Sequence, residues 1–273
     1  MKNGKTLVLV LLFFCGCNES PDNNSSNKNT GTKNEVPESV KNLIALVQQH
    51  PDSIGIRLAL ANAFDSIGYY KEALAQMDSL VKKDSMNYGL WFNKGQIAED
   101  AKDTTEAIKS YIKAINVYQS PDALLALANL YAERKNDRAL LICSRVKDLG
   151  LGREYDAGCA FITGVYFART GNKQQALNFF DESIANNYTY MQAYIEKGLV
   201  YFDDKQYNEA LKVFQFASKI NALDADPYYW QGRCYEMMNI KDSAILRFKQ
   251  SLSLDKNACE TKEALKRVEA KDK

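Results

Sequence analysis

Residues 192–220 read QAYIEKGLVYFDDKQYNEALKVFQFASKI and contain a spacing that recurs along the chain. Gly198 is followed by Tyr201 three residues later, Ala210 nine later, Phe214 four later and Ala217 three later. Six windows carry a version of this spacing, each beginning with a small residue: Ala61, Gly95, Ala128, Gly164, Gly198 and Gly232. Self-similarity at intervals of 33 to 36 residues predicts an array of structural repeats.

The spacing indicates two helices in each repeat. A small residue lets a second helix approach the first, and the residue three positions later lies on the same helical face. A second small residue follows in each window, at Ala73, Ala107, Ala139, Ala176, Ala210 and Ala244. Four residues after each of these stands a larger or apolar side chain: Met77, Tyr111, Cys143, Phe180, Phe214 and Phe248. We therefore predict six helical hairpins over residues 53–257.

These motifs resemble the tetratricopeptide repeat, which has the pattern W-x2-L-G-x2-Y followed by A-x3-F. The likeness covers residues 54–256 and is strongest in the last three windows, while Ala98 and Cys143 depart from it. The resemblance implies an all-α, right-handed superhelical solenoid. Helical patterns at residues 37–52 and 258–273 are predicted to cap its ends, since terminal caps keep solenoids soluble. We also expect a local irregularity at residues 147–155, where the exit from the third repeat is longer.

The N-terminus has the pattern of an exported protein. Residues 1–16 combine Lys2 and Lys5 with an apolar run that is too short to span a bilayer, which favours a signal peptide. The run ends in Cys-Gly-Cys and resembles the lipobox of bacterial lipoproteins, which implies lipidation of Cys17. An ordinary signal peptide cut nearby is the alternative. Residues 17–36 are polar and nearly devoid of apolar side chains, so they are predicted to form a flexible tether.

Composition and cysteine spacing exclude several classes. The chain has 35 basic and 34 acidic residues, so it lacks the positive surplus of a nucleic-acid-binding protein. The four cysteines beyond the N-terminus show no CxxC spacing, and neither a metal site nor a cofactor is predicted. We interpret all four as structural, although an even count in an exported protein leaves a disulfide open; they are Cys143, Cys159, Cys234 and Cys259.

Catalytic groups are not arranged in any recognised pattern. The single histidine, His50, precedes a proline at a predicted helix end, where a solvated terminus is the expected environment. A lone histidine has no partners for a triad. The adjacent carboxylates Glu99 and Asp100, like Asp203 and Asp204, are interpreted as solvated turn residues, because sequence neighbours do not face each other on a helix. The chain is accordingly predicted not to be an enzyme.

The resemblance implies a concave groove lined by one face of each first helix. That face carries the residue three before the small position and those one and four after it. The predicted partner-binding residues are Asn62, Phe92, Gln96, Leu125, Asn129, Phe161, Val165, Ile195, Leu199, Phe202, Tyr229 and Arg233. The early repeats would present a polar lining, and the fourth and fifth an apolar one suited to a protein segment. The alternative is that these side chains belong to the core.

We therefore expect a non-enzymatic scaffold that binds a protein or peptide partner. It would be lipid-anchored in the bacterial cell envelope, on the outer membrane facing the periplasm. The alternative function is a glycan- or solute-binding lipoprotein of an outer-membrane uptake system. Aromatic residues available for stacking on sugars are better explained as packing; they are Tyr188, Tyr190, Tyr228, Tyr229 and Trp230.

Overall fold

The computed structural model describes residues 36–270, and every regular element in that range is an α-helix. The described residues divide into two compact units between Gly150 and Leu151. The N-terminal unit contains α1 (Glu38–Gln49), α2 (Ile54–Ser66), α3 (Tyr70–Lys83), α4 (Tyr88–Asp100), α5 (Thr104–Val117), α6 (Pro121–Glu133) and α7 (Arg138–Asp148). The C-terminal unit contains α8 (Arg153–Arg169), α9 (Lys173–Asn186), α10 (Met191–Asp203), α11 (Tyr207–Ile220), α12 (Ala225–Met237), α13 (Lys241–Leu254) and α14 (Cys259–Ala270).

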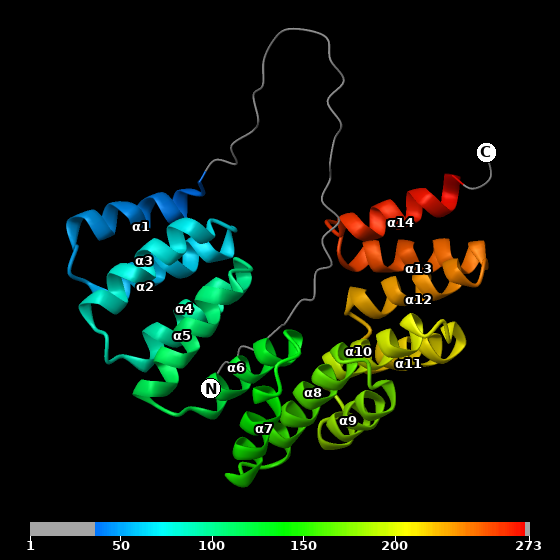
Figure 1. The fold of residues 1–273 in the computed structure, drawn as a ribbon. Coiled ribbons are helices and arrows are strands. Elements are labelled where there is room, and N and C mark those ends of the chain that lie inside the picture. The colour runs from blue at the N-terminus through cyan, green and yellow to red at the C-terminus, as the bar shows by residue number, and fades with distance from the viewer. Residues whose placement is uncertain (1–35, 271–273) are drawn as a thin grey trace, which may run out of the picture. The chain divides into compact units, whose positions relative to one another are not determined.

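Each predicted hairpin is formed by two consecutive helices that pack together within one unit (Figure 1). The pairs are α2 and α3, α4 and α5, α6 and α7, α8 and α9, α10 and α11, and α12 and α13. The all-α fold class is confirmed. α1 lies within the range predicted for the N-terminal cap, and α14 lies within the range predicted for the C-terminal cap.

Each hairpin is held by the two small positions that the sequence repeats. An added Cβ on Gly198 would lie 2.4 Å from two ring atoms of Phe214, and one on Gly164 would lie 2.6 Å from the Phe180 ring. In the first and third hairpins the small residue is alanine, and Met77 or Cys143 occupies the place of the ring. Where the small residue is alanine, its partner is thus less bulky than a ring, which avoids overpacking.

The turn inside every hairpin contains a left-handed residue seven positions after the small residue. These residues are Gly68 (φ 76°), Lys102 (61°), Lys135 (58°), Gly171 (86°), Lys205 (59°) and Asn239 (59°). The following residue donates its N–H back across the turn, as Gln206 does to the carbonyl of Tyr201 at 2.9 Å. This closes the first helix with a Schellman-type cap and returns the chain for the second helix.

The connection between α7 and α8 differs from the other connections. Gly152 has φ 99°, a conformation that an L-residue avoids, and it immediately precedes α8. α8 then runs for 17 residues, whereas α2, α4, α6, α10 and α12 each have 13. The irregularity expected at residues 147–155 coincides with this long helix and with the division between the two units.

Candidate functional site

The predicted groove residues form one stripe on the first helices of each unit. We call Leu58, Asn62, Asp65, Phe92, Gln96, Glu99, Leu125, Asn129 and Ala132 the N-terminal stripe. We call Phe161, Val165, Ala168, Ile195, Leu199, Phe202, Tyr229, Arg233 and Glu236 the C-terminal stripe. Each first helix contributes three members at i, i+4 and i+7, so the members share a helical face.

For two residues of the C-terminal stripe, the prediction that they line the groove is wrong. Phe161 exposes 4% of its surface and Val165 exposes 1%, so both are core residues. The Phe161 ring lies 6.0 Å from that of Phe180 and 5.2 Å from that of Tyr190. Tyr190 occupies the N-cap position of α10 but makes no side-chain cap hydrogen bond. It covers Phe161 instead, and its burial raises the pKa of its own hydroxyl to about 12.

The remaining apolar members of the C-terminal stripe are half-buried. Ile195, Leu199 and Phe202 keep part of their surface accessible on α10. Phe202 meets Tyr207 and Trp230 edge-on, with ring centroids 5.3 and 5.5 Å away. These contacts fix the Phe202 ring while one side of the stripe stays accessible.

An arginine-centred network ends the C-terminal stripe. The Arg233 guanidinium lies 5.8 Å from the Phe202 ring centroid and 5.9 Å from that of Tyr229. It also donates to the Tyr229 hydroxyl at 3.1 Å and approaches Glu236 at 3.2 Å. Arg267, on α14, donates two hydrogen bonds to Glu236 at 2.7 and 2.9 Å. This pair attaches α14 to α12. Sequence reasoning missed Arg267, because the repeat pattern tracks small and apolar positions and carries no signal for a cation.

The N-terminal stripe is more polar. Asn62 is exposed, whereas Phe92, Gln96 and Leu125 are half-buried. Phe92 is stacked on Tyr88 with ring centroids 5.6 Å apart. Asn129 is also buried, with 5% of its surface exposed, so it is not part of the accessible lining that was predicted. Neither its amide nitrogen nor its amide oxygen has a hydrogen-bond partner.

Glu99 differs from the expected solvated turn residue. It is half-buried, and its carboxylate accepts a hydrogen bond from the Tyr111 hydroxyl. Burial, with a smaller contribution from the neighbouring Asp100, raises the pKa of Glu99 to about 7, although the hydrogen bond from Tyr111 opposes the shift. Burial and the nearby Glu99 raise the pKa of Tyr111 in turn. Asp100, Asp203 and Asp204 are exposed or nearly so, as predicted for turn residues.

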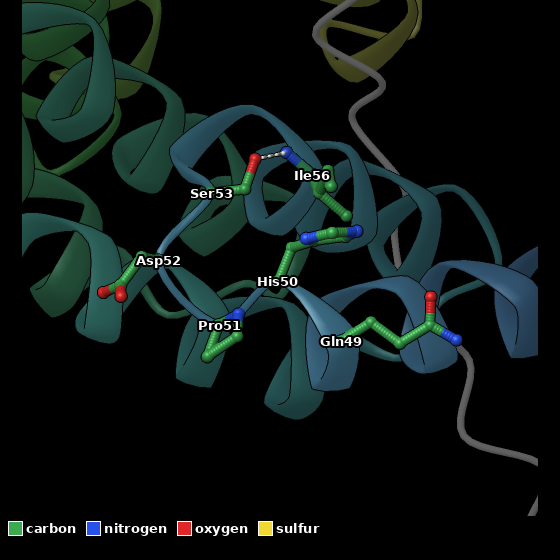
Figure 2. A pocket seen from close by; sticks show the side chains of 6 residues that line it. All are labelled: Gln49, His50, Pro51, Asp52, Ser53 and Ile56. Carbon is green, nitrogen blue, oxygen red and sulfur yellow. Dashed lines mark hydrogen bonds between the residues drawn. The ribbon is translucent and has the colours of Figure 1, made fainter.

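His50 lies at an open depression between α1 and α2, lined by Gln49, Pro51, Asp52, Ser53 and Ile56 (Figure 2). Its side chain is exposed, as expected for a solvated helix end. Ser53 caps α2 by accepting from the Ile56 N–H at 3.4 Å (Figure 2). Asp52 is paired with Lys83 at 2.8 Å, and this hydrogen bond lowers the pKa of Asp52. These contacts explain the side chains around His50 as capping and pairing.

The four cysteines of the described range differ in their exposure to solvent. Cys143, Cys159 and Cys234 are buried, and Cys259 is exposed. Burial raises the pKa of Cys234 to about 12, which keeps this thiol protonated and unreactive. Within residues 36–270, no group of three or more His, Cys, Asp or Glu side chains is placed to hold a metal ion.

The aromatic residues considered for sugar stacking are mostly engaged in packing. Tyr228 is buried, and Trp230 is stacked on Phe214 with ring centroids 5.9 Å apart. Tyr190 covers Phe161, and Tyr229 takes part in the arginine network. Tyr188 remains exposed, at 68% of its surface. Packing therefore accounts for four of these five side chains.

The predicted signal peptide, Cys17 and residues 17–35 of the tether lie outside the described residues. In the range that the structure covers, no helix combines the length and apolarity needed to cross a membrane.

A family model described as tetratricopeptide repeat matches residues 58–115, which form the first two hairpins. These two hairpins are tetratricopeptide repeats. It is 28% identical over 123 residues to the protein SGT1 homolog of Bos taurus, an alignment that covers 45% of this chain. The aligned part spans 31% of that relative, so the two proteins share a segment rather than their full length.

Solved structures agree with the fold of this chain. A tetratricopeptide repeat protein from Parabacteroides merdae is similar with a TM-score of 0.70 at 18% identity, covering 85% of this chain and 91% of the other. PilW, a type IV pilus biogenesis factor, gives a TM-score of 0.61 at 17% identity, covering 79% and 98%. Yeast Tom70 gives 0.57 at 16% identity, covering 86% and 58%. At these identities the likeness establishes the solenoid fold and leaves the partner open.

Proposed function

We propose that this protein is a non-enzymatic scaffold that binds a protein partner through the C-terminal stripe, while held at a bacterial envelope membrane by a lipid on Cys17. The observation that carries the proposal is the half-buried row Ile195, Leu199 and Phe202. Ile195 and Phe202 pack in part against the cluster of Ala210, Phe214 and Cys234, and all three members of the row keep part of their surface accessible. Accessible apolar side chains on a rigid helix are suited to a docked segment.

The neighbouring network defines the chemistry of the stripe. Tyr229 and Arg233 extend the apolar row with an aromatic ring and a guanidinium, two groups that are enriched in protein–protein hot spots. Arg233 contacts both Glu236 and the Tyr229 hydroxyl, and Arg267 holds Glu236, so little conformational entropy is lost when a partner binds. An apolar segment carrying a hydrogen-bond acceptor would match this surface.

Photo-crosslinking in intact cells tests this surface. A photoreactive amino acid at position 199 is expected to give one discrete protein adduct. The matched control is position 246, because Leu246 on α13 of the same unit is 60% exposed and lies off the stripe. Leu199→Glu in a chain labelled at position 195 should abolish the adduct, while Leu246→Glu should preserve it. The same adducts from positions 199 and 246, or none from 199, would refute the proposal.

The membrane attachment has its own test. Cys17→Ser is expected to move the protein from the membrane fraction to the soluble fraction, because the acyl chains supply the binding energy for the membrane. Cys259→Ser, which removes the exposed thiol of α14, is the control and should leave the distribution unchanged. Persistence of the Cys17→Ser protein in the membrane fraction would refute lipid anchoring at this residue without affecting the partner-binding proposal.

A further inference from the structure

A carboxylate recurs four residues after the small position in three repeats: Asp65 on α2, Glu99 on α4 and Glu236 on α12. Glu236 shows what this position can bind. The guanidinium of Arg267 arrives from the adjoining helix and donates two hydrogen bonds, at 2.7 and 2.9 Å. Paired hydrogen bonds of this kind match the planar fork of arginine to the two oxygens of a carboxylate. On α12, the carboxylate at this position therefore binds a guanidinium.

Glu99 occupies the equivalent position without a cation. The groups that act on its carboxyl are the Tyr111 hydroxyl from α5 and Asp100 from α4, and neither is positive. Asp65 from α2 lies in the same surroundings: burial raises the pKa of Tyr70 on α3, and Asp100 and Asp65 raise it further. The last turn of α4 contains no basic residue, so the negative end of the helix dipole also faces these carboxylates.

Asn129 provides a second observation on the same stripe. Its side chain is buried with 5% of its surface exposed, yet both polar atoms of the amide lack a hydrogen-bond partner. Its neighbour Leu130 belongs to the apolar cluster around Tyr111, the residue that donates to Glu99. A buried amide without partners costs free energy, and such groups call for an explanation such as a ligand.

We propose that Glu99, with Asn129 on the same stripe, receives the guanidinium of an arginine in the partner's bound segment, as Glu236 receives Arg267 within the chain. The inference rests on the proposed partner-binding function and specifies the partner: it carries an arginine that Glu99 binds. The Asn129 amide supplies an acceptor and a donor for the peptide groups next to that arginine. Arginine is favoured over lysine because the receptor position already shows paired hydrogen bonds to a guanidinium.

Binding of the cation is coupled to the proton on Glu99. The carboxyl of the free protein titrates near pH 7 because burial raises its pKa to about 7. A bound guanidinium favours the ionised form, so the pKa falls on binding and a proton is released below pH 7. Affinity should therefore rise with pH through 7 and level off above it. From a pKa of about 7, binding at pH 6 is expected to be roughly tenfold weaker than at pH 8.

The test uses the full chain and a small probe, acetyl-arginine-amide, titrated by NMR at pH 6 and pH 8. Acetyl-citrulline-amide, which has the same shape without the charge, is the matched probe. The arginine probe is expected to shift the Asn129 side-chain amide resonance, to lower the pKa of Glu99, and to bind roughly tenfold or more tightly than citrulline at pH 8. Glu99→Gln should remove both the preference and the pH dependence.

Glu72→Gln is the control variant, because Glu72 is an exposed carboxylate on α3. It should leave binding of the arginine probe unchanged. Equal binding of the arginine and citrulline probes, or an unchanged Glu99 pKa at saturation, would overturn the proposal, and both results come from the unmodified chain. Failure here leaves the adduct at position 199 intact, whereas failure of partner binding removes that adduct whatever the arginine probe does.

Discussion

Gly198→Ala tests the close contact between Gly198 and Phe214, which is the packing contact that the repeats share. The new Cβ would lie 2.4 Å from the Cε1 and Cζ atoms of Phe214, about 1 Å closer than an ordinary contact between carbon atoms. Phe214 is fully buried, so the ring must shift against its neighbours. Overpacking of this kind costs about 1–3 kcal/mol, and the better helix propensity of alanine offsets about 1 kcal/mol of it. We expect a net loss of about 1 kcal/mol in the free energy of unfolding.

The first hairpin shows which second substitution should compensate for Gly198→Ala. In the first hairpin Ala61 stands at the small position and the fully buried Met77 at the position of Phe214. Combining Gly198→Ala with Phe214→Met should therefore restore part of the lost stability, because methionine is narrower than the ring and flexible. The two changes touch the same atoms, so we expect a favourable coupling of about 1 kcal/mol beyond the sum of the single effects.

The measurement is urea unfolding followed by circular dichroism, together with hydrogen exchange of the α10 and α11 amides, because repeat arrays can unfold in parts. Gly55→Ala on α2 is the control. No neighbouring atom lies within 4 Å of an added Cβ there, so the change should be neutral or stabilising by up to about 1 kcal/mol. The reasoning is refuted if Gly198→Ala stabilises the protein as Gly55→Ala does, or if the double variant is additive within about 0.5 kcal/mol.

Three further changes test other parts of the structure. Phe161→Ala should lower the free energy of unfolding in urea by about 3–5 kcal/mol, as expected for a core ring. A loss below about 1 kcal/mol would contradict the assignment of Phe161 to the core. Lys205→Gly should stabilise by about 0.5–1 kcal/mol, because lysine there has φ 59°, whereas Lys212→Gly within α11 should destabilise by about 1 kcal/mol. Because the pKa of Glu99 is raised, the free energy of unfolding should fall as the pH rises from the unfolded-state pKa near 4.5 to about 7. Glu99→Gln should remove this pH dependence, and an unchanged pH dependence would contradict the raised pKa of Glu99.

The repeat spacing was sufficient to predict the hairpins because it records packing. Gly198 and Phe214 had to meet if one helix was to approach another, and their atoms do meet. The same reasoning placed Cys143 in the core, where it is paired with the alanine of its hairpin rather than with a glycine. These positions are specified by volume, which a sequence displays directly.

The surface stripe was predicted less well because accessibility depends on residues outside the repeat signature. Phe161 and Val165 were assigned to the groove by position, but Tyr190 covers the Phe161 ring. A signal was present: eight residues before the small position, four other repeats carry a residue whose side chain caps the helix, namely Ser53, Asn87, Ser120 and Asp224. Tyr190 stands at this position and does not cap its helix, and its ring packs on Phe161 instead.

The environment of Glu99 could not be predicted from the sequence. Its neighbour Asp100 and its place at a helix end suggested a solvated turn, and sequence does not reveal that Tyr111 reaches its carboxylate. The position weakens the fold above pH 7, because the ionised carboxylate is partly desolvated and lies at the negative end of α4. Glutamine would retain an acceptor for Tyr111 without the charge. The packing of the repeat does not need the charge of Glu99. Because Glu236, at the equivalent position of another repeat, binds an arginine, a ligand explains this charge better than the stability of the repeat does.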